Sequence, residues 1–285
     1  MPAAASVTAE SVASSRPRSN LQLRLLTASA GLPVLLAVIW IGGWPFALVV
    51  GTIALLASTE FVHGWLFPSM PIRAVLPQAP TFAVTAVMVT GVHADVRFAW
   101  IGLAFAALFA VLGYSRTGAF GPRRPYRVYF WCLGYIGAPM AAVILLRNEA
   151  NGRDWILVGV GATFAVDTGA YAVGRVLGRH KMAPKISPKK TWEGAAGGLV
   201  AGVVAVLLVN AALDTGVSAA KMLPFALAAP PLAMIGDLAE SAMKRRMGVK
   251  DASGLLPGHG GFLDRLDSLL FVLPALYIFL HVRVF

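Results

Sequence analysis

Long apolar runs separated by short polar segments follow one another along almost the whole chain. A helix that crosses the hydrocarbon layer of a bilayer, about 30 Å thick, needs roughly 20 apolar residues. The pattern predicts nine such helices, at residues 25–43, 46–66, 76–93, 98–115, 129–146, 155–175, 194–213, 222–243 and 266–284. The third is the weakest prediction, because three prolines crowd its start and proline disfavours a helix interior. The sequence therefore predicts an all-α, polytopic transmembrane helix bundle with about nine spans.

The composition agrees with this pattern and excludes several classes of protein. Hydrophobic residues make up 58% of the 285 positions and charged residues 13%, and the mean hydropathy is +0.72. Such a chain is too apolar for a soluble domain of this size, so we expect an integral membrane protein. The single Cys132 excludes an internal disulfide framework and a cysteine-based zinc site. Nucleic acid is a poor partner, because the basic residues are divided among short loops.

Basic residues are distributed unequally between the two sides of the predicted bundle. Residues 1–24 form a polar arm, which we expect to be disordered and cytoplasmic and to precede an uncleaved first span. With this arm inside, nineteen Lys and Arg residues fall in inner segments, and the outer segments hold only Arg97, Arg147, Arg153, Lys221 and Arg283. The positive-inside rule then places the amino terminus in the cytoplasm and the carboxyl terminus outside. The net charge of +11 follows from this rule, from attraction to anionic lipids, or from both.

The positions of the polar residues divide the chain into two parts after the arm. Residues 25–147 form helices with few candidate functional residues, and residues 148–285 form a catalytic part of helices and cytoplasmic loops. Glu60 is the exception in the first part, because an unpaired carboxylate near the inner end of a span is expensive. Two interpretations of Glu60 remain open. The acid is paired with His63 or a neighbouring Arg, or it is an outer carboxylate of a site formed by the second part.

The densest polar stretch runs from Gly236 to Ser268. It combines five acids with five bases, namely Asp237, Glu240, Lys244, Arg245, Arg246, Lys250, Asp251, Asp264, Arg265 and Asp267. Carboxylates that hold a hard cation, beside cations that hold phosphate, are what phosphoryl or nucleotidyl transfer requires. Helical spacing places Asp237, Glu240, Ser241 and Lys244 on one face. We expect Pro230 and Pro231, just upstream, to break the eighth span and open a polar space around these acids.

A second acidic pair, Asp264 and Asp267, is also three residues apart, at the start of the last predicted span. Helix geometry places the two on a common face. The glycines at 260 and 261 form a hinge that allows this face to approach the first pair. The sequence thus predicts one site built from both acidic pairs.

The fixed positions of this stretch resemble the signature of the phosphatidate cytidylyltransferases, also called CDP-diacylglycerol synthases. They are Ser241, Lys244-Arg245, Lys250-Asp251, Leu256-Pro257, His259-Gly260-Gly261 and Asp264-Arg265-Leu266-Asp267. Two further elements, Asp167-Thr168-x-Ala170-Tyr171 and Ser187-Pro188-x-Lys190-Thr191-x-Glu193-Gly194, also resemble the family. The resemblance implies a membrane enzyme of phospholipid biosynthesis. Such an enzyme transfers the cytidylyl group of CTP to phosphatidic acid and releases pyrophosphate.

Residues upstream of this signature add candidates for substrate binding. Asp167 lies within a span, so it should face the bundle interior or a water-filled space. Lys189, Lys190, Thr191 and Glu193 lie in an inner loop just before the seventh span, where a helix amino terminus favours an anion. This loop binds the triphosphate, or it is an ordinary positive-inside loop. The triphosphate interpretation also assigns Ser241, Arg245 and Lys250 to substrate binding.

The acids are candidates for Mg²⁺, which prefers few carboxylates together with phosphate oxygens and water. The resemblance implies Asp237 and Asp264 as metal ligands, and Asp267 holds a second cation or orients the first, with Glu240 in support. Lys244 is a catalytic candidate for the phosphates. His259 stands in a glycine loop, and its role as general base, phosphate donor or structural residue stays open.

Two other functions remain alternatives at this point. One is a CTP-dependent transferase or kinase acting on another lipid, such as a polyprenol or an ether lipid phosphate. The other is an organic-anion transporter, whose site would lie near the bilayer midplane between internal repeats. We expect the protein in the cell membrane, with its site facing the cytoplasm, and a homodimer remains open.

Overall fold

The computed structural model describes residues 20–69, 79–97, 104, 125–249, 252–253, 255 and 260–282. This part of the chain is helical apart from one short hairpin. The helices of the first half are α1 (Asn20–Ile41), α2 (Gly43–Leu66), α3 (Ala79–Gly91), α5 (Pro125–Cys132) and α6 (Ala138–Asn148). Those of the second half are α7 (Gly152–Leu177), α8 (Trp192–Ala212), α9 (Ala219–Met247), α10 (Leu263–Leu266) and α11 (Leu269–His281). A π-helical turn, η2 (Leu133–Gly137), joins α5 to α6.

Five helices within these residues are long and apolar enough to cross a membrane: Gly43–Leu66, Val128–Asn148, Gly152–Leu177, Trp192–Ala212 and Ala219–Met247. They coincide with the second and the fifth to eighth predicted spans. Helix α3 has only 13 residues, and the fourth predicted span, 98–115, lies outside the described residues except for Ala104. The predictions of nine spans and of their orientation therefore stay predictions.

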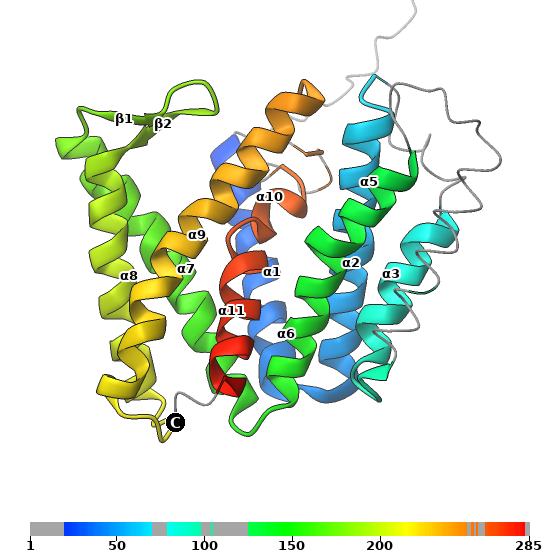
Figure 1. Ribbon diagram of the computed structural model, residues 1–285, viewed down its shortest axis with the longest axis horizontal. Helices are drawn as coiled ribbons and strands as arrows, with labels where there is room; N and C mark the ends of the chain where they lie inside the picture. The colour runs from blue at the N-terminus through cyan, green and yellow to red at the C-terminus, as the bar shows by residue number, and fades with distance from the viewer. Residues whose placement is uncertain are drawn as a thin grey trace, which may run out of the picture.

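The helices form an elongated bundle in which α7, α8 and α9 stand side by side at one end and α2 and α3 at the other (Figure 1). Helices α7 and α8 make the most extensive contact. The buried positions of α8 include Gly194, Gly198 and Gly202, at intervals of four, which lie on one face of the helix. A Cβ at Gly198 would lie 2.9 Å from the backbone oxygen of Val166. The absence of side chains therefore lets the two backbones approach closely.

The predicted break of the eighth span at Pro230 and Pro231 is wrong. Helix α9 continues through both prolines and through Pro224. Each proline removes one helical hydrogen bond, but Pro230 is buried against α8, where a Cβ at Gly202 would come within 2.7 Å of its ring. Packing against the neighbouring helix therefore holds α9 together at this point.

The last predicted span begins differently from the prediction. The chain turns at Asp267 and Ser268, and this turn separates the short α10 from α11. The Ser268 hydroxyl donates to the Ala233 carbonyl of α9 at 3.0 Å. A Cβ at Gly236 would lie 3.0 Å from the Cα of Ser268. The turn therefore rests directly on α9, next to the acids of that helix.

The basic loop between α7 and α8 forms an antiparallel hairpin of β1 (Lys181–Ala183) and β2 (Ser187–Thr191). It lies at the same end of the bundle as the carboxyl end of α9 (Figure 1). The basic loop and the acidic stretch, about 50 residues apart in the sequence, therefore meet at one end of the molecule.

Candidate active site

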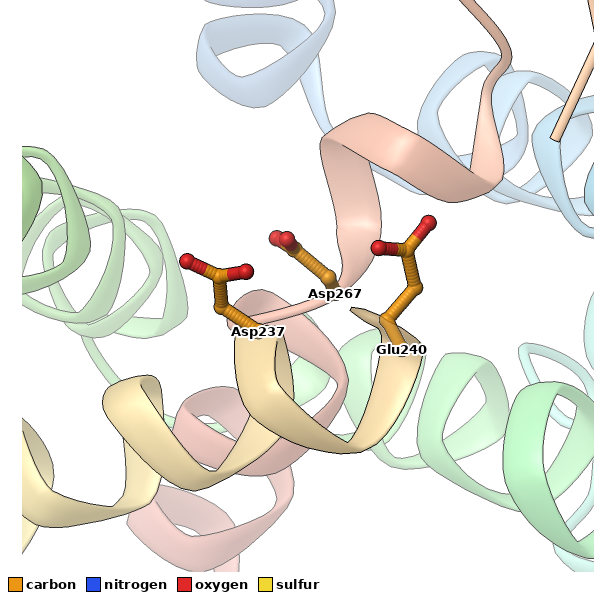
Figure 2. A group of neighbouring side chains, drawn as sticks. All are labelled: Asp237, Glu240 and Asp267. Carbon is orange, nitrogen blue, oxygen red and sulfur yellow. The ribbon is translucent and has the colours of Figure 1, made fainter. Parts of the chain in front are cut away.

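Three carboxylates from two elements converge on one point. Asp237 and Glu240 project from α9, and Asp267 projects from the turn that follows α10 (Figure 2). One oxygen atom of each lies within 4.8 Å of those of the other two. Of the second acidic pair, Asp267 thus approaches the first pair as predicted, whereas Asp264 is not a member of this group. Gly236 makes this possible, because it has no side chain to hold the turn away from α9.

Two lysines from different elements pair with these acids. The ammonium of Lys190, on β2, lies 2.6 Å from Asp237 Oδ2, and the Ser241 hydroxyl lies 3.3 Å from Oδ1. The ammonium of Lys244 lies 2.6 Å from Glu240 Oε2 and 2.7 Å from Asp264 Oδ1. The hairpin is therefore part of the site, and Lys244 bridges α9 and α10.

Asp264 lies at the edge of the cluster and holds the neighbouring loop. Its carboxylate accepts hydrogen bonds from the backbone N–H of Gly261 at 2.8 Å and of Ala252 at 3.1 Å. Burial raises the pKa of Asp264, but interactions with Glu240, Lys244 and the Gly261 N–H outweigh it and hold the pKa below its ordinary value. Asp264 is therefore a carboxylate at neutral pH. Its partners are protein groups, whereas Asp267 faces the other two acids.

The cluster has the chemistry of a site for a hard cation. Glu240 is 1% exposed, and its Oε1 atom is buried without a hydrogen-bond partner among the described residues. A buried carboxylate oxygen without a partner is costly. A divalent cation bound by Glu240, Asp237 and Asp267 would satisfy this atom and offset the repulsion among the three acids.

Asp167 on α7 faces the same region. It interacts electrostatically with Asp237, Lys190 and Arg265. The residue is exposed in the structure, and its placement toward the bundle interior or a water-filled space stays a prediction.

Thr191, at the end of β2, and Glu193, in the first turn of α8, have clear structural contacts. The Thr191 hydroxyl caps α8 by accepting the Gly194 N–H at 3.1 Å. The Glu193 carboxylate accepts a hydrogen bond from the backbone N–H of Arg179 at 3.1 Å. Its Oε1 atom lies 2.5 Å from Nδ1 of the His180 ring. Both contacts fasten the hairpin to the helices that flank it. Substrate binding by Thr191 and Glu193 stays a prediction.

The remaining candidates lie around this centre or outside the described residues. Arg245 donates to the Ile186 carbonyl at the hairpin turn at 3.3 Å, and the Lys189 side chain is exposed. Both lie where a charged ligand can reach them. Lys250 and His259 lie outside the described residues.

Comparison with known proteins places the chain in a family. The model of the cytidylyltransferase family matches residues 22–283. The chain belongs to the cytidylyltransferase family. It is 32% identical to a phosphatidate cytidylyltransferase of Staphylococcus saprophyticus over 263 residues, which are 91% of this chain and 99% of that protein. Proteins of the same name from Staphylococcus epidermidis and Staphylococcus aureus are 33% and 31% identical, again over 91% of this chain and 99% of theirs. The resemblance seen in the motifs is confirmed.

Tyr135 is a further candidate residue of this site that sequence reasoning missed. Tyr135 lies in the π-helical turn η2, and such turns are frequent at functional sites. Its ring packs between Phe61 and Phe271, with centroids at 5.9 and 6.2 Å. Its hydroxyl is buried, has no hydrogen-bond partner among the described residues, and interacts electrostatically with the three clustered acids. A tyrosine within an apolar, glycine-flanked run was the only signal in the sequence.

Proposed function

We propose that this protein transfers the cytidylyl group of CTP to phosphatidic acid, giving CDP-diacylglycerol and pyrophosphate. The family match over residues 22–283 carries this proposal. Its relatives at 31–33% identity, named phosphatidate cytidylyltransferases, align over nearly their whole length. The acid cluster supports it, since nucleotidyl transfer needs carboxylates beside cationic groups.

In the proposed reaction, a phosphate oxygen of phosphatidic acid attacks the α-phosphorus of CTP. A new P–O bond forms, the bond from the α-phosphorus to the bridging oxygen breaks, and its electron pair leaves with pyrophosphate. The lipid phosphate is already an oxyanion near neutral pH, so the attack does not require a strong base. The role of His259 therefore stays open.

Asp237, Glu240 and Asp267 would hold Mg²⁺, and Asp264 would stand beside them. When bound, the cation supplies charge that offsets the triphosphate and the departing pyrophosphate. Lys190 and Lys244 already lie against these carboxylates at 2.6–2.7 Å. They are therefore placed to contact phosphates bound at the same point, together with Lys189 and Arg245 from the hairpin and α9.

The setting proposed for this reaction is the cytoplasmic side of the cell membrane. The amino terminus would be cytoplasmic, so the hairpin and the acid cluster would face the compartment that holds CTP. The distribution of basic residues along the sequence supports this orientation, and the hairpin and the acid cluster lie toward one end of the bundle (Figure 1).

The test is an assay of the purified protein with CTP that is labelled at the α-phosphate and in the base. Four acceptors are compared: phosphatidic acid, a polyprenol, a polyprenyl phosphate and an ether lipid phosphate. CDP-diacylglycerol with stoichiometric pyrophosphate is expected from phosphatidic acid alone. Release of CDP with a phosphorylated lipid would indicate a kinase, and no turnover with any acceptor would contradict an enzyme of this class. Asp237→Asn serves as the inactive control.

A further inference from the structure

Glu60 connects the first half of the chain to the active site. It lies on α2 and is 1% exposed. Its Oε1 atom accepts the Ser253 hydroxyl at 2.5 Å and the Phe262 N–H at 3.0 Å, and its Oε2 atom accepts the Leu263 N–H at 2.8 Å. These three donors lie about 200 residues away in the sequence and belong to the segment that leads into α10.

The backbone of this segment is shaped to receive the carboxylate. A Cβ at Gly261 would lie 2.6–2.8 Å from the carboxyl atoms of Glu60, so any other residue at this position would force the carboxylate to shift. The adjacent Gly260 has a φ of 82°, a conformation that other residues rarely adopt. The two glycines therefore allow the chain to fold over Glu60 without a steric conflict.

The residues held by Glu60 lie immediately before the acids of the site. Leu263 begins α10, Asp264 is the next residue, and Asp267 follows one turn later. The Gly261 N–H that faces Asp264 belongs to the same short segment. A carboxylate that fixes the start of α10 therefore fixes the direction in which both acids leave the helix.

We propose that Glu60 is a positioning residue, which anchors α10 so that Asp264 and Asp267 reach Lys244 and the acids of α9. This role rests on the proposed cation site at Asp237, Glu240 and Asp267. The amino-terminal helices thus contribute to the site by holding one of its two walls, although they provide none of its clustered acids. These contacts favour the second of the two interpretations of Glu60, a carboxylate that supports a site formed by the second half of the chain.

The isosteric substitution Glu60→Gln tests the anchor. An amide presents an N–H₂ group where one oxygen stood, so at least one backbone N–H of Phe262 or Leu263 loses its acceptor. We expect hydrogen exchange in the peptide 260–268 to become at least about tenfold faster, the factor that corresponds to losing one charge-assisted hydrogen bond. Exchange in α8 should not change. Asp154→Asn is the matched control, because it alters another buried carboxylate, which pairs with Arg153 on α7.

Binding of the cation provides a second measurement that does not depend on turnover. In wild type, MgCl₂ alone should raise the unfolding midpoint of the detergent-solubilised protein. In Glu60→Gln this rise should shrink, and the MgCl₂ concentration for half-maximal activity should increase at least about threefold, while the apparent KM for CTP changes less. Gly261→Ala displaces the same contact from the backbone side and should reproduce both effects. The double variant should be no worse than the single ones, since both changes break one contact.

Each outcome decides the proposal. Unchanged exchange at 260–268 in folded Glu60→Gln, or faster exchange throughout the molecule, would overturn the anchor. Faster exchange at 260–268 together with an unaltered effect of MgCl₂ on the unfolding midpoint and on activity would overturn the link to the cation site. If Glu60→Gln does not fold, Gly261→Ala and Ser253→Ala are compared in the same way. Wild type that makes no CDP-lipid would contradict the proposed function, whereas the exchange comparison would still stand.

Discussion

Two lysines offset part of the charge of four carboxylates at the site. Lys190 pairs with Asp237, and Lys244 pairs with Glu240 and Asp264. Asp267 instead accepts the N–H of the next residue, Ser268, at 2.7 Å. Four acids and two ammonium groups leave an excess of two negative charges when all are ionised, which is the charge of one divalent cation. One divalent cation bound by the clustered acids would balance this excess.

The two acids of α10 and its turn should respond differently to neutralisation. In Asp267→Asn we expect activity to fall by more than the roughly 10–100-fold that is typical of losing a supporting group near a metal. The unfolding midpoint should equal or exceed that of wild type, because the substitution removes repulsion between Asp267 and Asp237. Asp264→Asn should lose activity and also stability, because Lys244 and two backbone N–H groups lose a charged acceptor. Turnover at limiting MgCl₂ and thermal unfolding measure the two effects. Equal unfolding midpoints in both variants would contradict this division of roles.

The neighbouring lysines of β2 offer a matched pair for the triphosphate. Lys190 contacts Asp237, whereas the Lys189 side chain is exposed. Lys190→Gln should lower kcat/KM for CTP by about ten- to a hundredfold, the usual cost of a charge-assisted phosphate contact of about 1.5–3 kcal/mol. Lys189→Gln should have a smaller effect. If both changes alter CTP kinetics by less than about twofold, the loop does no more than satisfy the positive-inside rule.

Among the elements, the helices with strong apolar runs were predictable and their local interruptions were not. Five predicted spans match helices because apolar length alone determines them. The continuity of α9 through Pro230 depends on a glycine in another helix, and the turn at Ser268 depends on the Ala233 carbonyl. The hairpin likewise rests on Glu193 accepting N–H groups of Arg179 and His180. Tertiary contacts of this kind leave no periodic signal in the sequence.

The close contact between α7 and α8 gives a prediction about stability. Alanine at Gly198 would bring its Cβ within 2.9 Å of the Val166 backbone oxygen, which cannot move aside as a side chain can. We expect Gly198→Ala to lower the free energy of unfolding by about 1–3 kcal/mol, the usual cost of overpacking. Gly161→Ala is the control, because its Cβ would meet only the Val209 side chain at 3.4 Å. Thermal unfolding in one detergent compares the two, and equal losses would show that the contact is not tight.

For the whole molecule, the motifs identified the chemistry before the geometry was known, while the way the two halves join was not predictable. The acids and lysines from Asp237 to Asp267 pointed to one site, and the structure brings three of the acids together. The contribution of Glu60 and Tyr135 depends on how α2 and η2 pack against α10 and α11, across more than 130 residues of sequence. Apolar periodicity carries no information about which helices become neighbours.

Orientation is the last prediction, and it follows from the distribution of charge over the whole chain. Nineteen basic residues in the predicted inner segments, against five outside, place the amino terminus and the hairpin in the cytoplasm and the carboxyl terminus outside. Substituted cysteines can test this in a Cys132→Ala background, although the native thiol is already buried. In intact cells, a membrane-impermeant maleimide should label a cysteine added after Phe285. It should not label Lys185→Cys at the hairpin turn until the cells are opened. Labelling of Lys185→Cys in intact cells would place the acid cluster away from CTP, and protection of the terminal cysteine would mean that the number of spans is even.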